Sequence, residues 1–449
     1  MSTTGSDSSK ALDRRDFLSI AAAGAAGALA ACGDDSGRAA ERASPPRTEP
    51  SPEWDEIRRQ FDLSPDTIHL GALYIASHPR SVREAIDRHR RGLDADPVNY
   101  LDGKIGSNER QVLALSAEYF GVPDSHVALT DSTTMGLGLI YNGLDVSRGQ
   151  EMLTTENNYY STDEALRLKA ESTGASVRRI RMYQSVESAT EGEIVDNIVR
   201  SVTPATRAVA LTWVHSSTGL KLPLRPIADR LEEVNASRSE AEQIVLCVDG
   251  VHGFGIEDVE LASLGCDLFA AGCHKWLFGP RGTGVVYASE RGWRSVRPTI
   301  PTFMADNVRD AWITGSEIAG PTTGRRFSPG GFKAYEHQWA MAEAFEFHRK
   351  IGKKKIADRT HELSRQLKKG LVAMEHVRLY TPLSDRLSAG IVCFDVDGMS
   401  PYAVVSRLAD RKIVATVTPY ATPYARLSPC IYNTNADIDT VLQEIRSFA

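Results

Sequence analysis

The chain has 449 residues, of which 42% are hydrophobic and 24% are charged, and its formal net charge is −6. This is an ordinary globular composition, long enough for a large domain and a smaller one. The charges form no basic block, which argues against a nucleic-acid-binding protein.

The N-terminal segment is typical of an export signal. Arg14 and Arg15 precede an apolar stretch, residues 17–31, that is too short and too rich in small residues to span a membrane as a stable helix. The paired arginines resemble the start of a twin-arginine (Tat) signal peptide. The alternative, an alanine-rich helix of a folded domain, leaves them without a role. We therefore predict a signal peptide over residues 1–32, the Tat export machinery as a partner, and a periplasmic or otherwise extracytoplasmic location.

The end of this segment, LAAC at residues 29–32, resembles a lipobox, in which the cysteine is lipidated after cleavage. Alanine-rich signal sequences that end in cysteine also arise by chance, so lipidation of Cys32 stays open here. No other segment is typical of a membrane span, so a lipid on Cys32 would be the only membrane attachment. Residues 33–53 are rich in Asp, Ser, Arg and Pro and are predicted to form a flexible linker.

The cysteines after the signal segment show no CxxC and no Cys/His spacing typical of a metal site. Most of them lie in apolar, strand-like surroundings, where cysteine behaves as a small hydrophobic residue. We expect no metal and no disulfide framework; the residues are Cys247, Cys266, Cys273, Cys393 and Cys430.

Strand-like and helix-like stretches alternate between residues 81 and 278. The predicted strands are residues 126–130, 151–155, 176–182, 206–214, 243–249 and 267–272, and helices are predicted at 81–93, 108–121, 193–202 and 226–237. This alternation predicts an α/β fold whose parallel sheet is covered by helices on both faces. We assign residues 54–330, which include an N-terminal segment, to this large domain.

The pattern changes after residue 330. A long helical region, 335–374, is followed by a strand within 388–398, a helix at 400–411, a strand at 412–417 and a last helix from residue 436. These elements predict a smaller α+β domain over residues 331–449.

Ligands of open α/β sheets bind at the carboxyl ends of the strands, so the residues after each strand are the informative ones. Ser132, Thr133 and Thr134 stand between a predicted strand and a helix, where hydroxyls and free N–H groups would bind a phosphate. The alternative is an ordinary helix N-cap. Ser216 lies in a polar run, residues 215–218, that either contacts a ligand ring or forms a capped loop.

Two further strand ends carry charged groups. Asp249 follows an apolar strand that would bury its carboxylate, which is costly unless a cation pairs with it. His252 lies three residues later, between glycines that allow close approach. Lys275 follows the next strand, where it is either a surface lysine or a buried amine whose pKa is lowered by desolvation.

Together these groups match one cofactor. An anion cradle, a buried carboxylate, an imidazole and a buried lysine at one sheet edge suit the phosphate, pyridinium nitrogen, phenolate and aldehyde of pyridoxal 5′-phosphate (PLP). Three stretches of the chain resemble the class V aminotransferase family. They are the pattern D-x-x-H at 249–252, the C-H-K sequence at 273–275 with the glycine-rich turn that follows it, and RLSPCIYNTNADID at 426–439. The resemblance runs from about residue 68 to the C-terminus. It implies PLP-dependent transferase fold type I, with a mainly parallel, seven-stranded-type sheet in the large domain.

The resemblance also implies roles for individual residues. Lys275 would hold PLP as a Schiff base, and Asp249 would keep the pyridine nitrogen protonated. His252 and Ser216 would contact the phenolic oxygen. Arg426 would bind the substrate α-carboxylate as a bidentate fork, the alternative being a surface arginine. The residues expected to hold the phosphate are Ser132, Thr133, Thr134 and His274.

The chain departs from the family pattern in three places. Cys273 stands where the family usually has serine, which weakens one phosphate donor. Asn157 stands near the position of the usual ring-stacking histidine, so we place Tyr159 over the ring instead. Gly330 and Gly331 stand where a Gly-Thr pair usually reaches the phosphate of the neighbouring subunit. A homodimer with sites at the interface is still expected from the family.

The reaction stays open between several types. Cysteine desulfurases of the family carry a mobile cysteine shortly before the arginine signature, and this chain has none until Cys430, beyond Arg426. The chain resembles the isopenicillin-N-epimerase-like branch and the Tat-exported PLP enzymes of pyoverdine maturation, which suggests a glutamyl group of a siderophore precursor as substrate. A racemase or C–S lyase is the alternative. A binding lipoprotein without activity is disfavoured because Lys275, Asp249 and Arg426 are all present.

Overall fold

Seven strands form the main sheet, in the order β2-β8-β7-β6-β5-β3-β4. The strands from β3 to β7 are parallel, whereas β8 runs antiparallel to both β2 and β7. Six of the seven were predicted, and β8 was missed. The strands are β2 (Val127–Thr130), β3 (Glu151–Thr155), β4 (Ser176–Ile180), β5 (Thr206–Thr212), β6 (Val245–Asp249), β7 (Leu268–Gly272) and β8 (Gly284–Ala288).

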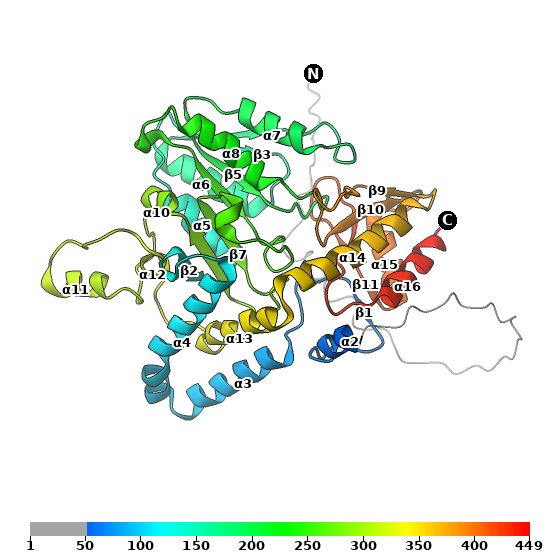
Figure 1. The fold of residues 1–449 in the computed structure, drawn as a ribbon, viewed down its shortest axis with the longest axis horizontal. Helices are drawn as coiled ribbons and strands as arrows, with labels where there is room; N and C mark the ends of the chain where they lie inside the picture. The colour runs from blue at the N-terminus through cyan, green and yellow to red at the C-terminus, as the bar shows by residue number, and fades with distance from the viewer. Residues whose placement is uncertain (1–51) are drawn as a thin grey trace, which may run out of the picture. The chain divides into compact units, whose positions relative to one another are not determined.

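The computed structural model describes residues 52–449, which lie within one compact unit (Figure 1). The predicted signal peptide with Cys32, and nearly all of the predicted linker, lie outside the described residues. The predicted division of the chain after residue 330 stays a prediction.

The central strands are apolar because helices cover both faces of the sheet. Along β5, Ala208 and Ala210 point to one core, and Val209 and Leu211 point to the other. Helices α5 (Thr133–Gly143) and α6 (Tyr160–Thr173) contribute to the first core; α4 (Pro97–Phe120), α7 (Glu191–Arg200) and α8 (Leu224–Asn235) contribute to the second. The edge strand β4 is only partly buried and carries arginines.

The long helical region predicted at 335–374 is two helices, α13 (Tyr335–Ile351) and α14 (Lys353–Val372). Gly352 separates them with a φ of 96°, a conformation that side-chain-bearing residues rarely adopt. The predicted helical region is therefore present, divided at this residue. Helix α13 packs against α3 (Arg80–Ala95) and α4, and α14 continues toward the C-terminal region (Figure 1).

A four-stranded antiparallel sheet, in the order β12-β13-β10-β9, lies in the C-terminal region. Its strands are β9 (Val377–Leu379), β10 (Val392–Val396), β12 (Thr416–Val417) and β13 (Ala425–Leu427), and its helices are α15 (Pro401–Asp410) and α16 (Asn435–Arg446). A separate apolar core lies beneath them. The N-terminal strand β1 (Ile68–His69) pairs with β11 (Ile413–Val414), so residues before the large sheet also belong to this region.

The remaining helices are short or lie at the periphery. Helix α11 stands on an extended loop at the left of Figure 1. No helix within residues 52–449 is long and apolar enough to cross a membrane. The bounds are α2 (Pro52–Arg58), α9 (Leu261–Leu264), α10 (Glu290–Ser295), α11 (Asp306–Thr314) and α12 (Gly324–Phe327), with 3₁₀ turns at Asp124–His126 and Glu240–Glu242.

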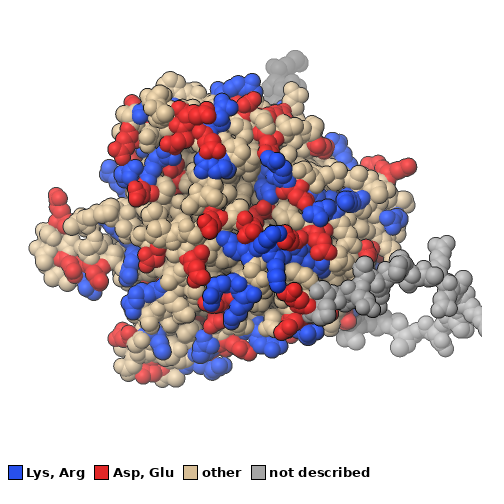
Figure 2. Space-filling model, in the orientation of Figure 1, with Lys and Arg blue, Asp and Glu red and all other residues tan. Residues whose placement is uncertain are grey.

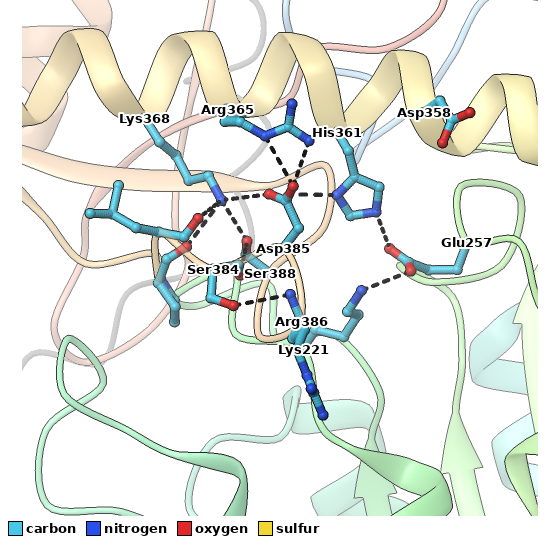
Figure 3. Close-up of polar contacts among 12 residues, drawn as sticks. Lys221, Glu257, Asp358, His361, Arg365, Lys368, Ser384, Asp385, Arg386 and Ser388 are labelled. Atoms are coloured by element: carbon cyan, nitrogen blue, oxygen red, sulfur yellow. Dashed lines mark hydrogen bonds and ion pairs between the residues drawn. The ribbon is translucent and has the colours of Figure 1, made fainter.

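A polar cluster ties α14 to loops that follow β5 and β6 (Figure 3). His361 Nε2 lies 3.0 Å from a carboxylate oxygen of Glu257, and Lys221 Nζ lies 2.8 Å from the other. The buried Lys368 donates to Ser388 Oγ at 2.6 Å. Lys221 lies just beyond the loop at 215–218, and Glu257 lies just beyond the loop at 249–252. The cluster thus anchors the two loops that carry predicted site residues.

Charged side chains of both signs are interspersed on the face shown in Figure 2.

Candidate functional site

The predicted site residues with charged groups lie at neighbouring strand ends. Asp249 is the last residue of β6 and is paired with Thr212 of β5 and Ala270 of β7. Lys275 follows the end of β7 by three residues. The prediction that Asp249 and Lys275 lie at adjacent strand ends is therefore confirmed.

Asp249 is a buried carboxylate without a cationic partner among the described residues. Its side chain is 3% exposed, and Oδ1 accepts one hydrogen bond, from the main-chain N–H of Val251 at 3.2 Å. Burial raises the pKa of Asp249 to about 6, against smaller lowering effects of the Val251 N–H and the Lys275 charge. The carboxylate therefore lacks the compensation that a protonated ring nitrogen would supply.

The Lys275 amine lies beside His252. Nζ of Lys275 is 3.5 Å from Nε2 of His252. Burial lowers the pKa of Lys275 to about 8, with Asp249 acting in the opposite direction and Arg426 lowering it further. About a tenth of the amine is therefore neutral at pH 7, far more than for an ordinary lysine, and only a neutral amine is a nucleophile or base.

The groups predicted to bind the phosphate meet at the N-terminus of α5. Ser132 is the N-cap, and its Oγ accepts from the main-chain N–H of Met135 at 3.1 Å. Oγ1 of Thr133 accepts from the N–H of Gly272 at 2.8 Å. Ser132 is therefore an ordinary helix N-cap. Because the hydroxyls of Ser132 and Thr133 accept in these contacts, each still has its own proton to donate to a phosphate.

His274 completes this group. A Cβ at Gly272 would lie 2.9 Å from the His274 ring and 3.1 Å from Thr133 Oγ1, so glycine is needed for the close approach. Burial, with the charges of Lys275 and Arg281, lowers the pKa of His274 to about 4. Thr134 is exposed, at the start of the helix. A neutral imidazole, two hydroxyls and a helix N-terminus can bind a phosphate here.

Arg426 is a buried guanidinium that makes only neutral contacts with described residues. Its side chain is 4% exposed; Nη1 donates to the main-chain oxygen of Ser216 at 2.8 Å, and Nε donates to Thr416 Oγ1 at 3.0 Å. Burial lowers the pKa of Arg426 from its usual value. A buried charge without a carboxylate partner is costly, which fits a binding site for a carboxylate ligand.

The hydroxyl of Ser216 is held by a residue that the sequence analysis missed. Ser216 Oγ lies 2.8 Å from the hydroxyl of Tyr420, in the loop between β12 and β13. Tyr159, predicted to cover the cofactor ring, is partly buried at the start of α6, with its ring centroid 6.4 Å from that of Tyr420 and 4.5 Å from that of Tyr160. The structure thus brings Tyr159 close to the Ser216–Arg426 pair.

Trp276 is the second residue that was missed. Its Nε1 lies 3.4 Å from Nδ1 of His252, and its side chain is fully buried. In the sequence, Trp276 is marked only by its position next to Lys275. Tyr420 is marked only by its position shortly before Arg426.

A surface hollow of about 380 Å³ begins at Ser132 and Thr134 and extends along α5 to Thr299 and Ile300. Lys275, Asp249 and Arg426 do not line it. We therefore place the reactive centre where Lys275, Asp249 and Arg426 converge. The hollow lies beside the predicted phosphate-binding residues Ser132 and Thr134.

The five described cysteines are free and buried. Burial raises the pKa of Cys273, Cys393 and Cys430 to about 12. A thiol in this state is a poor nucleophile. No group of three or more His, Cys, Asp or Glu side chains within residues 52–449 is arranged to hold a metal ion.

These groups fit PLP. Among the described residues Asp249 forms no ion pair with a cation and Arg426 none with an anion, and the neutral hydroxyl and imidazole donors at α5 lie at the same edge of the sheet as Lys275. Lys275 would hold the cofactor, Asp249 its ring nitrogen, His252 and Ser216 its phenolic oxygen, and the α5 group its phosphate.

Residues 89–441 match the sequence profile of the family described as "Aminotransferase class-V". Isopenicillin N epimerase of Streptomyces clavuligerus is 26% identical over 392 residues, which cover 86% of this chain and 96% of the epimerase. A probable cysteine desulfurase of Halalkalibacterium halodurans is 25% identical and covers 83% of this chain, with 91% of its own length aligned.

A solved structure of a C-DES mutant, with glycine covalently linked to the PLP cofactor, superposes with a TM-score of 0.78 at 21% identity. It covers 87% of this chain and 99% of its own.

Proposed function

Because the chain belongs to the class V aminotransferase family, we propose that it acts on the α-amino group of an amino acid, or of an amino-acid moiety within a peptide natural product. The protein is a PLP-dependent enzyme with fold type I, in the branch of the isopenicillin N epimerases. The observation that carries the substrate proposal is the buried Arg426, whose guanidinium forms no ion pair with a described residue.

Arg426 binds the substrate and Lys275 acts on it as a base. Arg426 binds the α-carboxylate through the N–H groups that its contacts with Ser216 and Thr416 leave free. The bound carboxylate pairs with the guanidinium, which orients the α-amine and the Cα–H bond toward Lys275. The neutral Lys275 amine accepts the proton at Cα and returns it.

Asp249 and His252 keep the site in the right protonation state. Bound PLP supplies an electron sink for the electron pair released at Cα. The Asp249 carboxylate holds a proton on the ring nitrogen, and pairing with that cation offsets the cost of burying the carboxylate. His252 stays neutral because burial and neighbouring cations keep its pKa well below the usual value.

The reaction that we propose is chemistry at the α-carbon. The nearest cysteine after Arg426 is Cys430, which is buried and whose pKa is raised, so it is unsuited to persulfide chemistry. Amino-group transfer, epimerisation and decarboxylation all remain within the proposal, and C–S lyase action is the second candidate because desulfurases are among the relatives.

We further propose an exported enzyme that acts as a homodimer. Tat export carries folded proteins, so the cofactor can be loaded before transport. A γ-linked glutamyl group of a siderophore precursor is the extracytoplasmic substrate that we favour, because it offers a free α-amine and a free α-carboxylate to Lys275 and Arg426. Light scattering of the mature protein tests the dimer.

The experiment that tests the function is product analysis by mass spectrometry. The purified holoenzyme is incubated with single amino acids and with peptides that carry a γ-linked glutamate, with and without a 2-oxo acid and with and without oxygen. The proposal is supported if any of these compounds loses its α-amino group or its α-carboxylate, or inverts its configuration at the α-carbon. Turnover only of substrates that lack an α-carboxylate would contradict it.

A further inference from the structure

Trp276 belongs to the main core and lies against Gly390 of the C-terminal region. It follows Lys275 directly, and its side chain is 0% exposed. A Cβ placed at Gly390, two residues before β10, would lie only 2.8 Å from Cη2 of Trp276. The indole ring is thus enclosed on the side of the C-terminal region and has little room to turn away from its hydrogen-bond partner.

That partner is His252. Nε1 of Trp276 lies 3.4 Å from Nδ1 of His252. An indole N–H can only donate, so Nδ1 has to accept and carries a lone pair. Burial first, and then the charges of Lys275 and Arg426, hold the pKa of His252 well below its usual value, so the ring is neutral. A neutral imidazole that accepts at Nδ1 carries its proton on Nε2.

Nε2 is the atom that faces Lys275, at 3.5 Å from Nζ. An Nε2–H group and an ammonium group are both donors and cannot pair with one another, whereas a neutral amine accepts through its lone pair. In the other tautomer Nε2 would accept from the ammonium and stabilise it. The tautomer of His252 therefore affects which form of Lys275 is favoured.

We propose that Trp276 is a positioning residue that fixes the Nε2–H tautomer of His252, so that the histidine presents a hydrogen-bond donor to the Lys275 amine and to the cofactor that Lys275 holds. The part that concerns PLP rests on the proposed function. The tautomer itself depends only on side chains of this chain. The competing view is that Trp276 merely fills space in the core.

The first test reads the tautomer directly. The full chain is labelled with ¹⁵N-histidine and freed of PLP, and the His252 signals are assigned by comparison with His252→Gln. We expect a protonated Nε2 and an unprotonated Nδ1 at neutral pH. A proton on Nδ1 would overturn the inference. If the chain never binds PLP, the proposed function fails, but this measurement still decides the tautomer.

The second test removes only the indole donor. Trp276→Phe keeps most of the buried volume and allows His252 to adopt the other tautomer. We expect the apparent pKa of Lys275 to rise by about one unit, which lowers the neutral fraction of the amine about tenfold at neutral pH. The pH dependence of PLP incorporation, followed by absorbance, measures this pKa. The other ionisable neighbours of Lys275 — Asp249, Arg426 and His274 — are unchanged in the variant, so the shift reports on His252.

Trp339→Phe is the matched control. Trp339 is also buried, at 2% exposed, but its Nε1 has no hydrogen-bond partner among the described residues. We expect this variant to leave the pKa of Lys275 unchanged. Equal shifts in both variants, or a shift in neither, would reduce Trp276 to a packing role. If Trp276→Phe does not fold, the tautomer measured in the unsubstituted chain decides the question.

Discussion

Nη1 of Arg426 donates a 2.8 Å hydrogen bond to the main-chain carbonyl oxygen of Ser216, which lies 210 residues earlier in the chain. This contact joins strand β13 of the C-terminal sheet to the loop that follows β5 of the main sheet. We propose that the Arg426 guanidinium binds the substrate and that the Ser216 hydroxyl contacts the cofactor. The hydrogen bond between the two residues places these two groups next to one another.

Lys275→Ala should abolish both the covalent attachment of PLP and turnover, because no other amine occupies this strand end. Borohydride trapping followed by peptide mapping should place the cofactor on Lys275. Lys368 is a stringent control, since burial also lowers its pKa to about 8. Its Nζ is hydrogen-bonded to Ser388 and to two main-chain oxygens, so Lys368→Met should keep the cofactor. Trapped PLP on Lys368 would refute the assignment.

Asp249→Asn should damage turnover far more than cofactor retention. The attachment to Lys275 and the phosphate contacts remain, but the ring nitrogen loses the carboxylate that keeps it protonated. The loss of a buried charge-assisted bond of roughly 3 kcal/mol lowers the rate about a hundredfold. Steady-state kinetics measure this, with the half-buried Asp395→Asn as control. A yellow Asp249→Asn variant with near-normal turnover would show that the carboxylate has a structural role.

The same substitution should stabilise the PLP-free protein at neutral pH. The folded-state pKa of Asp249, about 6, lies above its ordinary value of 3.8. Its stabilising contribution is therefore present below about pH 4 and is lost as the pH rises through 6. The difference of roughly two pKa units corresponds to about 3 kcal/mol. Urea unfolding at pH 4 and pH 7.5 should show the free energy of unfolding of Asp249→Asn exceeding that of the unsubstituted protein only at the higher pH; a constant difference would contradict this.

Arg426→Gln should weaken substrate binding through the α-carboxylate. A hydrogen bond to a charged group contributes about 1.5–3 kcal/mol, which predicts a rise in KM of about tenfold to a hundredfold. An amine analogue that lacks the carboxylate should bind equally to both proteins. The exposed Arg378, paired with Glu187, provides the control variant Arg378→Gln. An unchanged KM in Arg426→Gln would remove the guanidinium from the substrate site.

Replacing Arg14 and Arg15 by lysine should retain the protein in the cytoplasm, because the twin arginines are the feature that resembles a Tat signal. Cell fractionation reads the outcome. Labelled palmitate should attach to Cys32, and Cys32→Ala should prevent it. An unsubstituted protein found only in the cytoplasm would contradict the exported role and, with it, the siderophore substrate.

The sequence by itself determined six of the seven strands of the main sheet, in chain order, and the charged residues at its edge. Asp249 and Lys275 could be assigned to neighbouring strand ends because each follows an apolar run whose burial the hydrophobic pattern dictates. Strand β8 was missed because it is a short apolar run after a glycine-rich turn, and its antiparallel pairing with β2 and β7 is a long-range choice. The break at Gly352 depends on a backbone conformation that a helical pattern does not reveal.

Only the tertiary structure decided which side chains meet around those charges. The contact of Trp276 with His252, the contact of Tyr420 with Ser216, and the approach of Arg426 to the same loop join residues between 24 and 210 positions apart. Local patterns do not encode such contacts, because they join segments that only the folded chain brings together. Residue types and spacing determine which groups stand at a strand end, whereas burial in the folded chain determines their protonation and tertiary packing determines their partners.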